Sequence, residues 1–391
     1  MRRPAAGRKF VAAGQKGSQQ NPEDGALSFP FPEAPEYGEV FDVAPGVKWT
    51  RIPLPYRLDH VNVYLIEDGI GWALIDTGIN TPEARAAWLR LFDGPLEGIT
   101  ISRVIVTHHH PDHIGLAGWL CRRFNAPLLT SHSTYTGSLL TTLDPGHLGS
   151  EESRKFYYRH GMSEEFADQI ATFGQAYLRQ VSPLPTTYLR LLHGDTLVLG
   201  QRRFRVLSGD GHAHEQILIW CEDEGLFFAA DQVLEKITPN IGVWSREPDG
   251  DPLGHFMRSL KRMATEMPDD LLVLPGHRRP FYGLHARCEE ILEHHEERCG
   301  LILEACAEGA KSVDELVPTV FHNRKLTAHE MSFAFGETFA HANRLIRRGD
   351  LEWDMRGDRP VCRLPETAPS KPAAKKPGAK PTKSRKRKEQ S

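Results

Sequence analysis

The sequence has no apolar run close to the roughly 20 residues that a membrane span requires. Its N-terminus begins with arginines but lacks the continuous apolar segment of a secretory signal, which argues against export by that route. Its 6 cysteines form no C-x-x-C pair and no framework spacing, as expected for reduced thiols. We therefore expect a cytoplasmic protein without membrane partners. A mitochondrial transit peptide is the alternative to a solvated N-terminal tail.

The charge that is present is unevenly distributed. The formal net charge is −3, yet residues 1–20 carry 5 basic and no acidic side chains, and residues 369–391 carry 9 basic side chains and 1 acidic one. The part between holds 34 basic and 50 acidic side chains, a net charge of −16. An acidic body repels polyanions, so nucleic acid is expected, if at all, only at the basic tail. A solvated tail is the alternative.

The length of 391 residues exceeds one typical domain, and 40% hydrophobic residues suffice for a large core. Composition and periodicity predict strands, helices and turns in alternation, followed by a mostly helical region. The expected parts are a flexible basic extension at 1–39, a catalytic domain at 40–284 with a helical lid insert at 131–190, a second domain at 285–364, and a disordered basic tail at 365–391. Aromatic residues of the insert form either a pocket wall or ordinary core.

The most informative segment is THHHPDHIG, residues 107–115. Side chains of an extended chain alternate, so His108 and His110 project to the same side and can reach one ion. Asp112 and His113 follow at the start of the next helix, where they can address a second ion. Imidazole with carboxylate is the ligand set expected for Zn²⁺, and iron and manganese also accept it. A chance run of surface histidines is the alternative.

Three later segments each place a candidate ligand just after an expected strand. They are GDGH ending at His212, AAD ending at Asp231 and PGH ending at His277. Small residues beside the ligand let the backbone turn sharply, so that the side chain can point into a site. Four strand ends thus carry metal-ligating residue types.

This pattern resembles the metallo-β-lactamase fold superfamily, whose signature H-x-H-x-D-H is met by residues 108–113. The resemblance covers about residues 40–284 and implies an α/β fold, a four-layer αββα sandwich. It also implies two metal ions per chain, expected to be Zn²⁺. The first ion would be held by His108, His110 and His212, the second by Asp112, His113 and His277, and Asp231 would bridge them. Asp76 resembles the carboxylate that orients such ligands, with an ordinary turn residue as the alternative.

A metal-bridging hydroxide would then cleave the substrate, with Asp112 orienting the water or accepting its proton. The segment GHAHEQ departs from the G-H-T-P-G of glyoxalase II-like members, and His214 is a second catalytic candidate. A solvent-facing histidine is the alternative. The basic residues by which glyoxalase II grips glutathione are not recognisable. The expected substrate is a small acyl compound, a thioester or an ester.

Residues 285–364 resemble the winged-helix module appended to one branch of this superfamily. The segment holds 11 basic and 15 acidic side chains, whereas a nucleic-acid-binding module would normally have a basic face. We therefore expect it to pack against the catalytic domain or against a second copy in a homodimer. An RNA-cleaving phosphodiesterase of the winged-helix branch, a lactonase or β-lactamase-type enzyme, and a binding protein without activity are the alternative functions.

Overall fold

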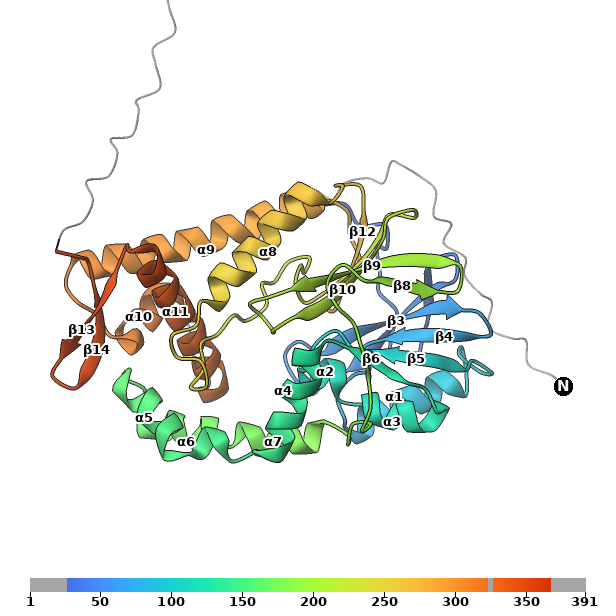
Figure 1. Cartoon of the computed structure of the whole chain (residues 1–391), viewed down its shortest axis with the longest axis horizontal. Coiled ribbons are helices and arrows are strands. Elements are labelled where there is room, and N and C mark those ends of the chain that lie inside the picture. Colours follow the sequence, from blue (N-terminus) through green and yellow to red (C-terminus); the bar gives the residue numbers. More distant parts are fainter. Residues whose placement is uncertain (1–26, 323–325, 367–391) are drawn as a thin grey trace, which may run out of the picture.

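The computed structural model describes residues 27–322 and 326–366. Within them, two β-sheets lie face to face, and helices cover the outer surface of each sheet (Figure 1). The expected tail at 365–391 lies outside the described residues from 367 onward, as do residues 1–26 and 323–325.

The first sheet has seven strands, which follow one another in chain order. The first four pair as antiparallel neighbours, and β4 to β7 pair in parallel. The strands are β1 (Phe41–Ala44), β2 (Val47–Pro53), β3 (His60–Asp68), β4 (Gly71–Ile75), β5 (Ile101–Ile105), β6 (Leu128–Thr130) and β7 (Leu189–Arg190). Helices α1 (Pro82–Phe92) and α3 (Ala117–Phe124) cover the outer face. Helix α1 begins at Pro82, whose fixed φ suits the first helical position, and the Thr81 side chain caps it.

The second sheet has five strands in the order β12-β11-β10-β9-β8. Only β11 and β12 are parallel; the other neighbours are antiparallel. The strands are β8 (Thr196–Leu199), β9 (Arg202–Gly209), β10 (Gln216–Cys221), β11 (Leu226–Ala230) and β12 (Leu272–Pro275). Helices α8 (Pro252–Glu266) and α9 (Leu284–Ala307) lie over its outer face.

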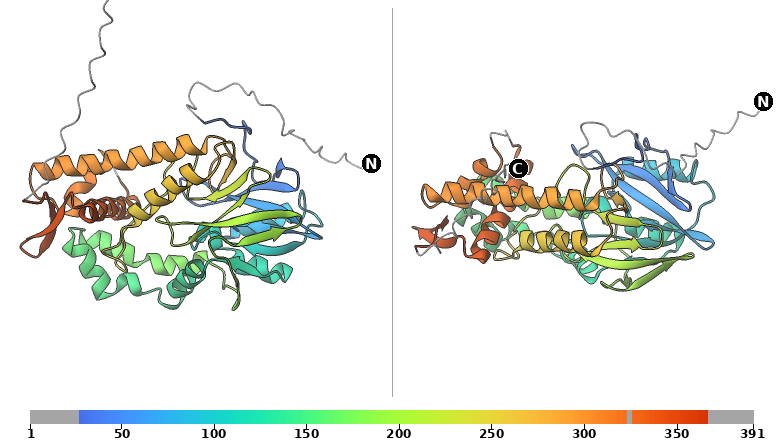
Figure 2. Two further views of the ribbon diagram at one scale, coloured as in Figure 1. Left: turned by 45° about the horizontal axis from the view of Figure 1, so that its top comes forward. Right: turned by 90° about the horizontal axis from the view of Figure 1, so that it is seen from above.

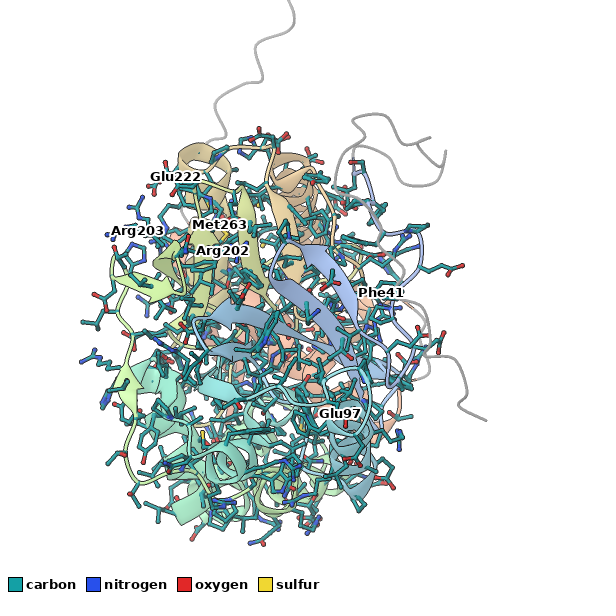
Figure 3. All side chains as sticks on the ribbon, turned by 90° about the vertical axis from the view of Figure 1, so that its right-hand side faces the viewer. Phe41, Glu97, Arg202, Arg203, Glu222 and Met263 are labelled. Carbon is teal, nitrogen blue, oxygen red and sulfur yellow. The ribbon has the colours of Figure 1, made fainter. Side chains whose placement is uncertain are left out.

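Alternation along the strands separates the hydrophobic layers. On β10, Ile217 and Ile219 face the first sheet, whereas Leu218 and Trp220 face the helices. Figure 3 looks at the end of this sandwich, with Phe41 of the first sheet and Arg202 of the second on its two sides. The predicted four-layer αββα sandwich is confirmed, because helices cover both sheets.

The insert and the C-terminal region pack together away from the sheets (Figure 2). The rings of Phe156 in the insert and Phe339 near the C-terminus are stacked 5.2 Å apart. The insert contains α4 (His132–Leu143), η1 (His147–Gly149), α5 (Glu151–Arg159), α6 (Glu164–Ala171) and α7 (Phe173–Gln180). The C-terminal region adds α10 (Val313–Val320), α11 (Ala328–Arg348), β13 (Glu352–Arg356) and β14 (Arg359–Arg363) to α9. Its likeness to a winged helix stays a prediction.

The expectation that a flexible extension reaches residue 39 needs correction. Leu27 and Phe31 are buried, and Ser28 exchanges two backbone hydrogen bonds with Tyr282. Apolar residues at 27, 29 and 31 alternate with a period of two, which places them against the body of the molecule. The many prolines nearby hid this pattern.

Among the described residues, none of the helices combines the length and the apolar character that a bilayer crossing demands. All 6 cysteines are buried and free, which agrees with the expected reduced thiols.

Candidate metal centre

The predicted ligand residues meet at one edge of the sandwich. The chain delivers them there after strands β5, β9, β11 and β12, and all except Asp112 and His113 lie in the loop that follows the strand. The first of these loops continues into α2 (Pro111–Ile114), whose first turn carries Asp112 and His113. Residues more than 160 positions apart therefore form one buried group.

Three histidines form the first part of the group. The ring nitrogens of His108 and His110, Nε2 and Nδ1, lie 3.0 Å apart, and the ring centroids of His110 and His212 are 4.5 Å apart. Ligand atoms of these three residues all lie within 4.8 Å of one another. This spacing lets three imidazoles bind one ion.

Asp231 stands between this first part and a second one. Its Oδ2 lies 3.4 Å from Nε2 of each of His113, His212 and His277. The Oδ2 of Asp112 is 3.3 Å from His277 Nε2 and 3.5 Å from His113 Nε2. Asp231 is thus placed where a carboxylate can bridge two ions, and Asp112, His113 and His277 form a second candidate ligand set.

Unpaired polar atoms show that these residues fit metal ions. His113 Nε2, His212 Nε2 and Asp231 Oδ1 are buried without a hydrogen-bond partner among the described residues. Such atoms are costly unless a ligand satisfies them. A Cβ on Gly276 would lie 2.3 Å from Asp231 Oδ1 and 3.0 Å from His113, so only glycine leaves this space open.

The opposite ring nitrogens hold the imidazoles in position. Asp76 Oδ2 lies 2.8 Å from His113 Nδ1, the contact expected for an orienting carboxylate. His212 Nδ1 donates to the carbonyl oxygen of Asn240 at 2.8 Å, and His277 Nδ1 donates to that of His60 at 2.7 Å. Each contact fixes the tautomer that leaves Nε2 free to bind metal.

The electrostatics favour neutral imidazoles at His108 and His110, and ionised carboxylates at Asp112 and Asp231. Burial and the neighbouring imidazoles hold the pKa values of His108 and His110 well below their usual range. Burial alone would raise the pKa of Asp231, but His277 and His113 outweigh it and hold that pKa well below its usual range. Burial likewise opposes protonation of His277, yet Asp231 and Asp112 raise its pKa to about 10. Its proton must leave when a metal ion binds.

His214 lies outside the group. Its side chain is 68% exposed, and its Nε2 is 3.6 Å from a carboxylate oxygen of Glu247. It lines a cleft of about 1020 Å³ together with Asp210 and Glu215, which flank the His212 segment. The other walls come from α4 and α8. Its catalytic role stays a prediction.

Two supporting residues had no signal in the sequence. Asn240 and His60 act through backbone carbonyl oxygens, which every residue type offers, so no side-chain pattern identifies them.

The fold and this donor set together define a metallo-hydrolase. Residues 56–277 match the model of the metallo-beta-lactamase superfamily, and residues 299–364 match that of the metallo-beta-lactamase-like C-terminal domain. The chain belongs to the metallo-beta-lactamase superfamily, whose members depend on metal, and it is a hydrolase.

Relatives support this assignment. A beta-lactamase domain protein from Burkholderia ambifaria, known from a crystal structure, is 35% identical in sequence to this chain. The two structures match with a TM-score of 0.82, over 88% of this chain and 100% of the other. A metallo-beta-lactamase family protein from Thermus thermophilus is 31% identical, with a TM-score of 0.69, covering 83% of this chain and 100% of the other. A probable metallo-hydrolase from Bacillus subtilis is 26% identical over 63% of this chain and 76% of its own length.

Proposed function

We propose that the protein is a dinuclear metal hydrolase, with zinc as its metal, that cleaves a small acyl ester or thioester. The observation that carries the proposal is the central position of Asp231, 3.4 Å from three imidazole nitrogens that belong to both candidate ligand sets. One set is His108, His110 and His212, and the other is Asp112, His113 and His277.

Bound metal ions would supply Lewis acidity and a water of lowered pKa near neutral pH. Asp112 is suited to orient a water molecule, because its side chain is 21% exposed, compared with 7% for Asp231. Burial opposes its ionisation, but His113 and His277 keep its pKa well below the usual range, so the ionised carboxylate can accept a hydrogen bond from water. His214, at the cleft, is assigned proton transfer to the leaving group.

The cleft beside the His212 segment supports an acyl substrate. Helix α4 lines it with Leu139, Leu140 and Leu143, whose exposed fractions are 39%, 46% and 73%. This apolar wall suits a hydrocarbon chain, and Arg258 and Arg262 of α8 line another side of the cleft. The proposal includes the lid role expected of the 131–190 insert, since its helix α4 lines the cleft.

Variants of the ligand group test the metal role. Asp231→Asn and His110→Ala should each lose bound metal and turnover together, since each removes a ligand. Elemental analysis should give two metal equivalents per wild-type chain. The control is His147→Ala, which changes a histidine of the insert outside the group and should keep both metal equivalents. Full activity of Asp231→Asn would contradict the assignment.

A substrate panel tests the reaction class. Thioesters, esters, lactones, nitrocefin and a short RNA should be compared, and the proposal expects turnover of an ester or thioester. Cleavage of RNA alone would favour the phosphodiesterase alternative.

Substitution in the cleft tests the place of the acyl chain. Leu140→Asp should lower kcat/KM about tenfold for a long-chain ester, since it removes apolar contact, and leave an acetyl ester unchanged. Leu89→Asp, an equally exposed position on α1, serves as control. Equal effects on both chain lengths would place the acyl chain elsewhere.

A further inference from the structure

A path of hydrogen bonds leads from His212 to the C-terminal helices. Its Nδ1 donates to the Asn240 carbonyl oxygen at 2.8 Å. The side-chain Nδ2 of Asn240 in turn lies 3.2 Å from Oε2 of Glu337 and 3.2 Å from the carbonyl oxygen of Phe333, both on α11. The backbone that orients His212 is therefore held by another part of the chain.

Glu337 is itself fixed by a buried ion pair. It is only 6% exposed, and its Oε1 contacts the guanidinium group of Arg298 on α9. The same guanidinium lies over the ring of Phe321, 4.8 Å from its centroid. One carboxylate oxygen thus binds the arginine and leaves the other for Asn240. Burial of such a pair is costly, so its precise geometry needs a reason beyond stability.

The loop that carries Asn240 depends on outside contacts. Between β11 and α8 the chain runs from residue 231 to 251 without a helix or strand. Helix α11 supplies anchors along it: Val243 donates its amide to Gly336, and the Asn343 side chain donates to the carbonyl oxygens of Pro248 and Gly250. Two contacts from α11 reach Asn240, the residue that holds His212: the carbonyl oxygen of Phe333 and the side chain of Glu337.

We propose that Glu337 is a positioning residue for His212, acting through Asn240, so that the C-terminal helices set the orientation of a metal-facing imidazole. Donation from Nδ1 selects the tautomer whose Nε2 faces Asp231, 3.4 Å away. Glu337 fixes the Asn240 carbonyl and thereby the direction of that donation. The inference rests on the proposed metal role of His212.

A polarity swap tests the path in the full chain. Asn240→Asp places two carboxylates against each other, and Glu337→Gln leaves one acceptor oxygen where Asn240 and Arg298 each need one. Each should weaken zinc binding about tenfold or more, measured by competition with a chromophoric chelator. The double variant restores a donor at 337 and an acceptor at 240, so it should recover part of the affinity, while the carbonyl oxygen of Phe333 still lacks the donor that Asn240 supplies. Cobalt-substituted protein should show altered d–d absorption in the single variants and absorption closer to that of the wild type in the double variant.

Asn343→Ala is the matched control, because it removes a buried contact between the same helix and the same loop, away from Asn240. It should lower the melting temperature yet leave zinc affinity and the cobalt spectrum unchanged. Wild-type affinity in both single variants would overturn the inference, as would an equal loss in Asn343→Ala. Wild-type protein that binds no metal would instead refute the proposed function.

Discussion

Asp76 ties the metal-facing histidines to the first sheet. It accepts hydrogen bonds from the amide and hydroxyl of Thr107, at 2.8 and 2.9 Å, and lies 2.8 Å from His113 Nδ1. Its backbone has a φ of 59°, in the left-handed region that aspartate tolerates better than most residues. These contacts offset that strain and hold the His113 ring.

Removal of this carboxylate should weaken metal binding without removing a ligand. Asp76→Ala is expected to lower zinc affinity about 10- to 100-fold, because His113 loses its orienting partner. The affinity is measured by chelator competition.

Asp68 provides the control for this variant. Its carboxylate is buried at the last residue of β3, at the end of the sheet away from Asp76. There it accepts hydrogen bonds from the Ser102 hydroxyl and the Gly200 amide. Asp68→Ala should keep wild-type zinc affinity. If both variants bound zinc alike, Asp76 would have no orienting role.

The ligand residues themselves were predictable from local sequence. His108 and His110 follow a short apolar strand at a spacing of two, and each later ligand comes after glycine or alanine at a strand end. Among their supports, Asp76 was predictable from its place after a strand, but Asn240 and Glu337 were not, because folding alone brings the Asn240 carbonyl to His212 and the Glu337 carboxylate to Asn240.

At the scale of elements, α9 and α11 are joined by a buried histidine pair. His341 Nδ1 donates to the carbonyl oxygen of Glu337, so its Nε2 accepts from His295 Nδ1 at 3.1 Å. Burial lowers the pKa of His295 to about 2 and that of His341 to about 3, and Arg298 and His294 also disfavour a charge on each ring. Both rings are therefore neutral in the folded protein.

This pair should make the protein less stable in acid. The unfolded chain binds protons at these histidines below about pH 6.5, whereas the folded chain does not, so stability is full above that pH and falls below it. Each histidine contributes on the order of 1.4 kcal/mol per pH unit in this range. His341→Gln keeps a donor and an acceptor but cannot titrate. Urea unfolding at pH 7 and pH 5 should show a smaller loss of unfolding free energy in this variant than in the wild type. An identical loss in both proteins would contradict the assignment.

Element types were largely predictable as well. Strand β2 (Val47–Pro53) and helix α8 (Pro252–Glu266) follow local signals, namely hydrophobic periodicity and capping residues. Strand β1 and the burial of Leu27 and Phe31 were not expected, since proline-rich sequence hides the alternation there.

At the scale of the whole molecule, one hydrophobic cluster crosses the expected boundary between residues 284 and 285. It contains Phe227 of the second sheet, Phe256 of α8, Ile291 of α9 and Phe339 of α11, together with Phe156 of the insert. The catalytic and C-terminal regions thus share a core and depend on each other for burial.

A shared core predicts one unfolding transition. The metal-free protein should give a single calorimetric peak, and Phe339→Ala should shift the whole peak downward, with a loss of about 3–5 kcal/mol. Two separable peaks, of which only one moved in Phe339→Ala, would show independent domains.

The sequence by itself determined the fold family and the residues of the candidate centre, because strand alternation, helix caps and ligand types after strand ends are local properties. Tertiary structure alone decided which atoms meet: Asp231 among three imidazoles, Asp76 beneath His113, and Glu337 behind Asn240. These contacts join residues far apart in the chain, and several use backbone atoms, which carry no residue identity. Their geometry arises only when the two sheets and the C-terminal helices pack around one core.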